Sequence, residues 1–186
     1  MEGLVEQIDI YCERTDFTYW AEPLNAVSNA AFLIAALVMW ARLRPAPVPG
    51  GRVLCAILFA IGVGSYLWHT HATGWAVALD SGSIAVFILA YLYLANRAFW
   101  GWPARGAALG TAAFIPYAAA TVPLFQALPF FSISAGYWPV AALIAAYAVA
   151  LRRRAPETAR GLGIGAGLLT LSLTFRSVDA PLCAAL

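Results

Sequence analysis

The run Val53-Leu-Cys-Ala-Ile-Leu-Phe-Ala-Ile-Gly-Val-Gly-Ser-Tyr-Leu-Trp68 contains no charged side chain. A helix needs about 20 apolar residues to cross a hydrocarbon core of about 30 Å, and this run supplies most of them. The rest of the sequence agrees, since 62% of its 186 residues are hydrophobic and only 11% are charged. This balance excludes an ordinary soluble domain and predicts a membrane protein.

Five further stretches have the same character, so we predict an all-α, polytopic transmembrane helix bundle. It forms a single domain over residues 1–186, in which an acidic segment, residues 1–22, precedes the bundle of residues 23–186. Pro116 and Pro123 are expected to kink the fourth span. The six predicted spans are Leu24–Ala41, Val53–Trp68, Trp75–Ala95, Ala107–Phe125, Phe130–Leu151 and Gly161–Phe175.

Arginines in the connecting loops predict how the chain is oriented. Nine of the eleven arginines follow the first, third and fifth spans, and the second and fourth connections carry none. The positive-inside rule then places the N-terminus outside and the three basic loops in the cytoplasm. No cleaved signal peptide is expected, because the first 22 residues hold six acids and one arginine. We expect an integral protein of a bacterial inner membrane, with its polar groups at the outer face.

The first polar group consists of Ser65, His69 and Asp80. Ser65 and His69 are four residues apart and share a helix face, whereas His71 points the other way. The short Thr70–Gly74 connection lets Asp80 approach from the next helix. Two chemistries fit: a serine nucleophile with His69 as base and Asp80 as orienter, or a metal at His69 with Asp80 handling the proton of a metal-bound water. The spacing does not choose between them.

The second polar group lies in the N-terminal segment, where Asp9, Glu13 and Asp16 precede Glu22. Glu22, Asn25 and Asn29 follow one another at i, i+3 and i+7, which predicts a polar stripe on one helix face. Several carboxylates together with amide oxygens are a hard oxygen set suited to Ca²⁺. The alternative is a solvated acidic terminus that helps to keep the N-terminus outside.

Two of the three cysteines, Cys12 and Cys183, are predicted to lie outside, where oxidation is allowed. We therefore hypothesise a Cys12–Cys183 disulfide. Two free, half-buried thiols are the alternative, because sequence alone does not define pairing. Cys55 lies at the cytoplasmic end of the second span.

The polar segments together resemble the alkaline ceramidase family, part of a wider superfamily of seven-helix membrane hydrolases that includes the adiponectin-type receptors. The resemblance covers nearly the whole chain, and the interval of eleven residues from His69 to Asp80 is that of the family. The matching segments, in family order, are Tyr11-Cys12-Glu13, Ala21-Glu22-Pro23-Leu24-Asn25-Ala26-Val27-Ser28-Asn29, Gly64-Ser65-x-x-x-His69, Asp80 and Arg176-Ser177-Val178-Asp179-x-x-x-Cys183.

The resemblance implies a Zn²⁺-dependent amidase that cleaves the N-acyl bond of ceramide-type membrane lipids, releasing a fatty acid and a sphingoid base. His69 would be a zinc ligand. Asp80 would position or deprotonate the zinc-bound water, and Ser65 would hydrogen-bond that water or the oxyanion.

The resemblance also implies a calcium site, with Glu13 and Glu22 as ligands. The family has an aspartate where this chain has Ile10, so Asp9 and Asp16 are expected to substitute for it as nearby calcium ligands.

The family completes its zinc site with a His-x-x-x-His pair on a seventh helix, whereas this sequence ends at Leu186. The expectation is therefore a truncated form of a longer protein that lacks activity as it stands. Two alternatives remain: a metal-free Ser65–His69–Asp80 lipid hydrolase, and a non-catalytic membrane protein that binds lipid or calcium. No nucleic-acid partner is expected, and the sequence does not predict an oligomeric state.

Overall fold

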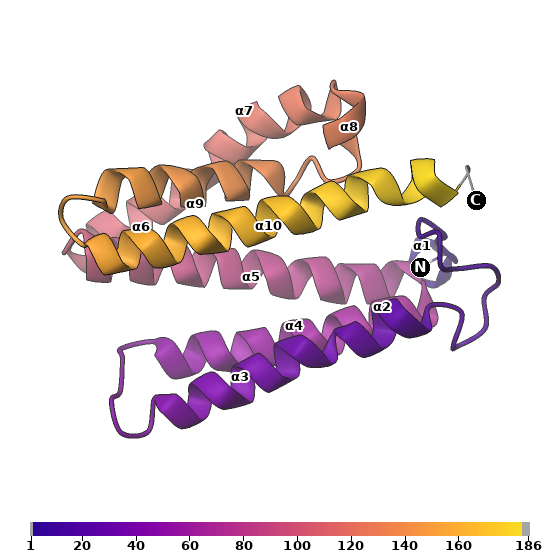
Figure 1. Ribbon diagram of the computed structural model, residues 1–186, viewed down its shortest axis with the longest axis horizontal. Helices are drawn as coiled ribbons and strands as arrows, with labels where there is room; N and C mark the ends of the chain where they lie inside the picture. The colour runs from indigo at the N-terminus through magenta and orange to yellow at the C-terminus, as the bar shows by residue number, and fades with distance from the viewer. Residues whose placement is uncertain (1, 184–186) are drawn as a thin grey trace. The chain divides into compact units, whose positions relative to one another are not determined.

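The computed structural model describes residues 2–183, except for the side chains of Glu2 and Ala180. Over these residues the chain is helical, apart from its loops and one isolated antiparallel bridge between Gln7 and Thr73. The helices, shown in Figure 1, are α1 (Glu2–Val5), α2 (Pro23–Ser28), α3 (Ala30–Arg42), α4 (Gly51–His71), α5 (Gly74–Phe99), α6 (Ala104–Ala112), α7 (Phe114–Gln126), α8 (Pro129–Ser132), α9 (Trp138–Leu151) and α10 (Pro156–Cys183).

Five helical segments within the described residues are long and apolar enough to cross a membrane. Helix α9 is also apolar but is shorter than these five segments. The prediction of an all-α transmembrane helix bundle is therefore confirmed. The five segments are Pro23–Arg42, Gly51–His71, Gly74–Phe99, Ala104–Gln126 and Pro156–Cys183.

The predicted fifth span, Phe130–Leu151, is not one continuous helix, and this prediction was wrong. The chain forms the short α8, turns through residues 133–137, and only then enters α9. Pro139 favours the break, because its nitrogen has no hydrogen to donate to the carbonyl of residue 135. Pro139 lies in the first turn of α9, where a backbone nitrogen has no helical partner and the missing hydrogen costs nothing.

Two other predicted spans are interrupted for a single residue. The first span divides into α2 and α3 at Asn29, whose side-chain Nδ2 donates to the carbonyl of Asn25 at 2.8 Å. The fourth divides into α6 and α7 at Ala113, three residues before Pro116. Pro116 cannot donate to the carbonyl of residue 112, so the helical hydrogen bonds are lost at this point, as the predicted kink requires.

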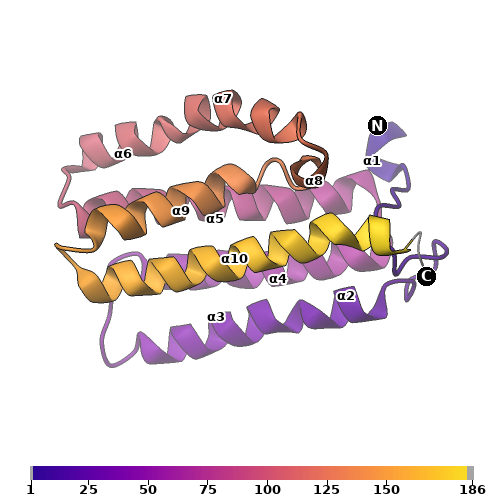
Figure 2. The same ribbon diagram turned by 45° about the horizontal axis from the view of Figure 1, so that its top comes forward.

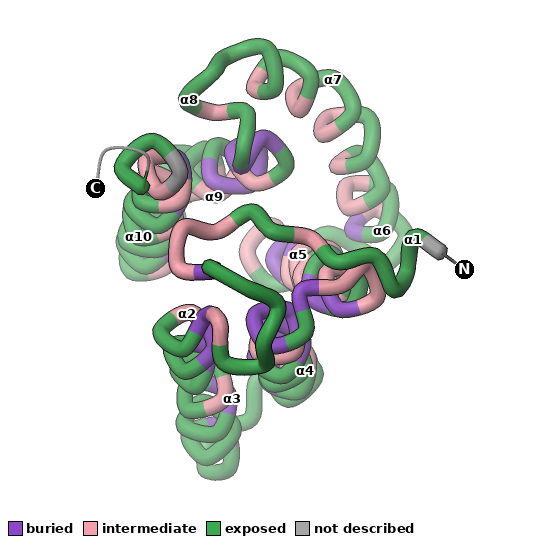
Figure 3. The backbone as a smooth tube through the Cα atoms, turned by 90° about the vertical axis from the view of Figure 1, so that its right-hand side faces the viewer, coloured by how far each residue is buried: buried purple, intermediate pink, exposed green. Residues whose placement is uncertain are grey.

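The chain forms two compact units, Met1–Leu94 and Ala95–Leu186. In the first unit α2 and α3 pack along α4, and Figure 2 shows these helices side by side. Figure 3 shows buried residues on α2 and α4 where the two helices face each other. In the second unit α9 packs along α10 around Trp138, Ala141 and Leu173. The predicted single domain stays a prediction.

Helices α4 and α5 approach closely at Gly64. A Cβ atom added at Gly64 would lie 3.3 Å from both the Cα of Asp80 and the carbonyl oxygen of Leu79. The missing side chain thus allows the backbone of α5 to lie against α4 beside Ser65.

We expect Gly64→Leu to lower the free energy of unfolding by about 1–3 kcal/mol, because the added side chain forces the two backbones apart. Thermal unfolding of the detergent-purified protein measures the effect. Gly82→Leu in α5 is the matched control, since a Cβ atom there meets nothing within 4 Å. Equal losses in the two variants would contradict close packing at Gly64.

Candidate functional site

The N-terminal segment is held against the turn between α4 and α5. The amide of Ile8 donates to the carbonyl of Ala72 at 2.8 Å, and the amide of Gly74 donates to the carbonyl of Glu6 at 3.1 Å. Ile8 and Tyr11 pack on a small core that includes Trp68 and Ala72. These contacts place the residues that follow Tyr11 beside the end of α4, where His69 lies.

Glu22 is the centre of the site, immediately before α2, and only 2% of its side chain is exposed. Its Oε1 accepts a hydrogen bond from Nε of Arg14 at 2.5 Å, and its Oε2 pairs with Nδ1 of His69 at 2.5 Å. Nδ2 of Asn25 donates to Oε2 at 3.4 Å. Both carboxylate oxygens are therefore bound by side chains from three different segments.

These contacts keep Glu22 ionised. Burial alone raises the pKa of the Glu22 carboxyl, but the hydrogen bonds and charges of His69 and Arg14 outweigh it. The pKa of Glu22 lies below its ordinary value of 4.5 as a result. An ionised carboxylate only accepts hydrogen bonds, so Nδ1 of His69 carries a proton.

Arg14 is as buried as its partner, with 1% of its side chain exposed. Besides the bond to Glu22, its Nη2 donates to the carbonyl oxygen of His69 at 2.9 Å and its Nη1 to the carbonyl oxygen of Asp16 at 3.1 Å. Its guanidinium also lies 5.8 Å from the centre of the Phe17 ring. One arginine thus connects the N-terminal loop, the start of α2 and the end of α4.

His69 is buried, and its ring is fixed on one side by Glu22 and on another by Tyr11, whose ring centre is 4.9 Å away. A histidine whose Nδ1–H is bound by a carboxylate has Nε2 as its basic nitrogen, the arrangement typical of metal-ligating histidines. His71, by contrast, is exposed, and its ring lies 5.6 Å from that of Tyr19 and 5.2 Å from that of Trp75. The two histidines have separate environments.

Ser65 and Asp80 are also buried, and the close approach at Gly64 brings their two helices together. Asp80 is the one acidic residue between Glu22 and Glu157 in the sequence. Among residues 2–183, no hydrogen bond joins Ser65 to His69. The Nδ1 atom that a serine triad would pair with Asp80 is paired with Glu22 instead.

The other predicted calcium ligands have local partners. Oε1 and Oε2 of Glu13 accept from the amides of Leu24 and Asn25, at 2.6 and 2.9 Å, and so bind the free amides at the start of α2. Asp16 accepts from both the hydroxyl and the amide of Thr18, which hold the pKa of its carboxyl below the ordinary value. Asp9 is exposed.

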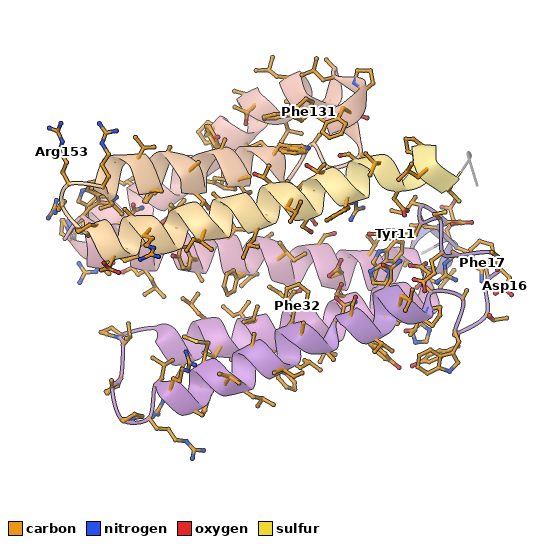
Figure 4. All side chains as sticks on the ribbon, in the orientation of Figure 1. Tyr11, Asp16, Phe17, Phe32, Phe131 and Arg153 are labelled. Atoms are coloured by element: carbon orange, nitrogen blue, oxygen red, sulfur yellow. The ribbon has the colours of Figure 1, made fainter. Side chains whose placement is uncertain are left out.

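Figure 4 shows Asp16 and Phe17 on the part of the N-terminal loop that extends beyond the helix ends, with Tyr11 nearer the helices. In the described part of the chain, no three His, Cys, Asp or Glu side chains come together as a metal site. The calcium ligand set, Asp9, Glu13, Asp16 and Glu22, stays a prediction.

The cysteines divide between the two units. Cys55 is a buried free thiol in α4. Cys12 belongs to the first unit and Cys183 to the second, so the predicted Cys12–Cys183 disulfide would join them, and it stays a prediction.

Arg14 is a residue of the site that sequence reasoning missed, because it was considered only as the one arginine in the acidic N-terminal segment. A signal was present in the composition. Arg14 is the single arginine among the first 22 residues, which hold six acids, and a lone cation in an acidic segment is a natural partner for a buried carboxylate.

The fold and the site together define a polytopic helical membrane protein with a buried carboxylate–histidine pair and a second buried acid at the ends of its spans. Comparison with protein families identifies this class more closely. The chain belongs to the Ceramidase family, whose model matches residues 8–186. Membership implies a hydrolase that acts on amide bonds and is consistent with a metal-dependent enzyme. Neither the curated proteins nor the solved structures gave a match.

Proposed function

We propose that this protein is a zinc-dependent membrane amidase that hydrolyses the N-acyl bond of ceramide-type lipids to a fatty acid and a sphingoid base. The observation that carries the proposal is the pairing of Nδ1 of His69 with the buried carboxylate of Glu22. It occurs in a chain of the Ceramidase family, at the same end of α4 and α5 as Ser65 and Asp80.

His69 would hold the zinc ion through Nε2, with Glu22 fixing the ring and increasing its basicity. Zinc bound there would polarise the amide carbonyl and bring water closer to ionisation at neutral pH. A catalytic zinc ion normally has three protein ligands, so the proposal requires ligands besides His69.

The chain's own groups then have distinct tasks. Asp80 accepts the proton of the attacking water and returns it to the leaving nitrogen, as a general base and then a general acid. Ser65 donates its hydroxyl hydrogen to the oxygen that becomes negative in the tetrahedral intermediate. The apolar surfaces of the helices accommodate the two hydrocarbon chains of the lipid, so the amide lies at the membrane boundary.

Replacing His69 by alanine tests the proposal. We expect the variant to lose both bound zinc and hydrolysis of a fluorescent ceramide, measured on the same detergent-purified samples. His71→Ala is the matched control, since that exposed histidine is two residues away, and it should keep both. Zinc and turnover that survive in His69→Ala, or that are absent from the parent, contradict the proposal.

The two alternatives predict different results. A metal-free serine hydrolase requires that a fluorophosphonate probe label Ser65 and that chelators leave turnover unchanged. A non-catalytic binder requires lipid or calcium binding with no amide hydrolysis at all. The pairing of His69 with Glu22 favours the zinc enzyme, because a serine triad would need Asp80 at Nδ1.

We further propose that the N-terminus and the site face outward from a bacterial inner membrane, as the arginine distribution indicates. A membrane-impermeant maleimide should label Thr15→Cys in intact cells. It should label Arg44→Cys only after permeabilisation, with the parent chain as background. The reverse pattern would overturn this orientation.

A further inference from the structure

The guanidinium of Arg14 is buried and bound by three oxygen atoms. Its three partners are a carboxylate oxygen of Glu22 and the carbonyl oxygens of His69 and Asp16. They come from separate parts of the chain, and two of them are main-chain atoms. These three oxygens therefore bind a group that carries a full positive charge.

The carboxylate of Glu22 and the carbonyl of His69 are both stabilised by a nearby positive charge. Glu22 is buried, and an uncompensated buried carboxylate is strongly unfavourable. The carbonyl of His69 lies in the last turn of α4, where carbonyl groups have no helical partner and carry the negative end of the helix dipole. Arg14 satisfies the carboxylate and the carbonyl at the same time.

A calcium ion does not fit these residues as they lie. Calcium takes six to eight oxygen ligands, but the Oε1 atom of Glu22 already accepts from Arg14, and both oxygens of Glu13 accept from main-chain amides. A divalent cation beside Glu22 would also be repelled by the guanidinium at hydrogen-bond distance from the same carboxylate. The calcium site implied by the family resemblance would require Arg14 to leave.

We propose that Arg14 is the built-in cation of this site, standing where a divalent cation would otherwise balance Glu22 and so making the site independent of calcium. Arg14 is a positioning residue: it anchors the carboxylate that holds Nδ1 of His69, and it binds the carbonyl of the same histidine. The effect on catalysis rests on the proposed function, whereas the replacement of calcium by Arg14 does not.

The experiment compares unfolding temperatures of the detergent-purified protein in excess calcium and in a calcium chelator. For the parent we expect the same temperature in both. Arg14→Ala should unfold about 10 °C lower in chelator, because a buried charge has lost its partner. Calcium should restore part of that loss, since the vacated space is lined by the carboxylate and carbonyl oxygens that calcium prefers.

Two further variants complete the comparison. Arg14→Lys should fall between the parent and Arg14→Ala, because an ammonium group keeps the charge but lacks the planar fork that reaches three oxygens. Its kcat for ceramide hydrolysis should fall while KM stays unchanged, as expected for a misplaced His69. Arg44→Ala, which removes an exposed arginine elsewhere, should show no loss and no calcium response.

Each outcome decides the inference. Calcium stabilisation of the parent overturns it, and this measurement needs no variant to fold. An Arg14→Ala variant that is as stable as the parent overturns the inference. Loss of stability in Arg14→Ala and Arg14→Lys overturns it as well, if calcium raises the unfolding temperature of neither variant. If the parent hydrolyses no ceramide but the calcium responses are as expected, the proposed function fails and the inference about Arg14 stands.

Discussion

Replacing Glu22 by glutamine is expected to lower the free energy of unfolding by about 3–5 kcal/mol, the usual effect of removing one partner of a buried ion pair. Glutamine has nearly the same shape, so the loss reflects charge. Arg14 would keep its full positive charge in a buried position, and Nδ1 of His69 would donate to a neutral amide oxygen. Thermal unfolding in detergent measures the change.

Glu13→Gln is the matched control for this prediction. Glu13 is half-buried and accepts hydrogen bonds from the amides of Leu24 and Asn25, so its replacement should cost about 0.5–1.5 kcal/mol. If the Glu22 variant loses no more than the Glu13 variant, the buried ion pair does not stabilise the protein in the way proposed.

The difference in stability between the parent and Glu22→Gln should depend on pH, and the direction of this dependence follows from the pKa of Glu22. The pKa of Glu22 in the folded protein lies below its ordinary value of 4.5. Its stabilising contribution is therefore complete above that ordinary value and is lost as the pH falls through the lower, folded-state pKa. The difference in stability between the parent and Glu22→Gln should narrow over this acidic range, and a constant difference would contradict the assignment.

The membrane-spanning helices could be predicted because the bilayer imposes a simple rule. Any spanning segment must be long, apolar and internally hydrogen-bonded, and five segments of this chain meet the rule as predicted. The prediction of one continuous span over Phe130–Leu151 was wrong, because hydropathy contains no information about backbone hydrogen bonds. The run is apolar throughout, yet Pro139 withholds a donor and the helix begins only at Trp138.

Part of the site also followed from local spacing. Glu22, Asn25 and Asn29 were expected on one helix face, and hydrogen bonds do connect Asn25 to Glu22 and Asn29 to Asn25. Such contacts depend on residues three and four apart, which helical geometry alone brings together.

The contacts of Arg14 could not be predicted in this way. Arg14 bonds to Glu22 eight residues away across an irregular loop, and to the carbonyl of His69, 55 residues away. Neither distance is set by a helical or strand period. They depend on how the N-terminal segment folds back over the turn between α4 and α5, and this becomes visible only when main-chain contacts such as that between Ile8 and Ala72 are known.

Replacing Asp80 by asparagine should lower kcat for ceramide hydrolysis by about 10²–10⁴-fold, the range that a positioned general acid–base group contributes. Asparagine keeps the size of the side chain but takes up no proton. Bound zinc and KM should stay close to those of the parent, because Asp80 acts on the attacking water. Ser81→Ala, at the exposed neighbouring residue, is the control and should retain full turnover.

The Asp80 and Glu22 variants are informative together because the two acids have different partners. Glu22 is bound by Arg14 and His69, so its loss should appear first in stability and in zinc retention. Loss of Asp80 should appear in turnover while zinc and the unfolding temperature are retained. If Asp80→Asn instead releases zinc and unfolds early, Asp80 supports the structure of the site, and the general base must be another group.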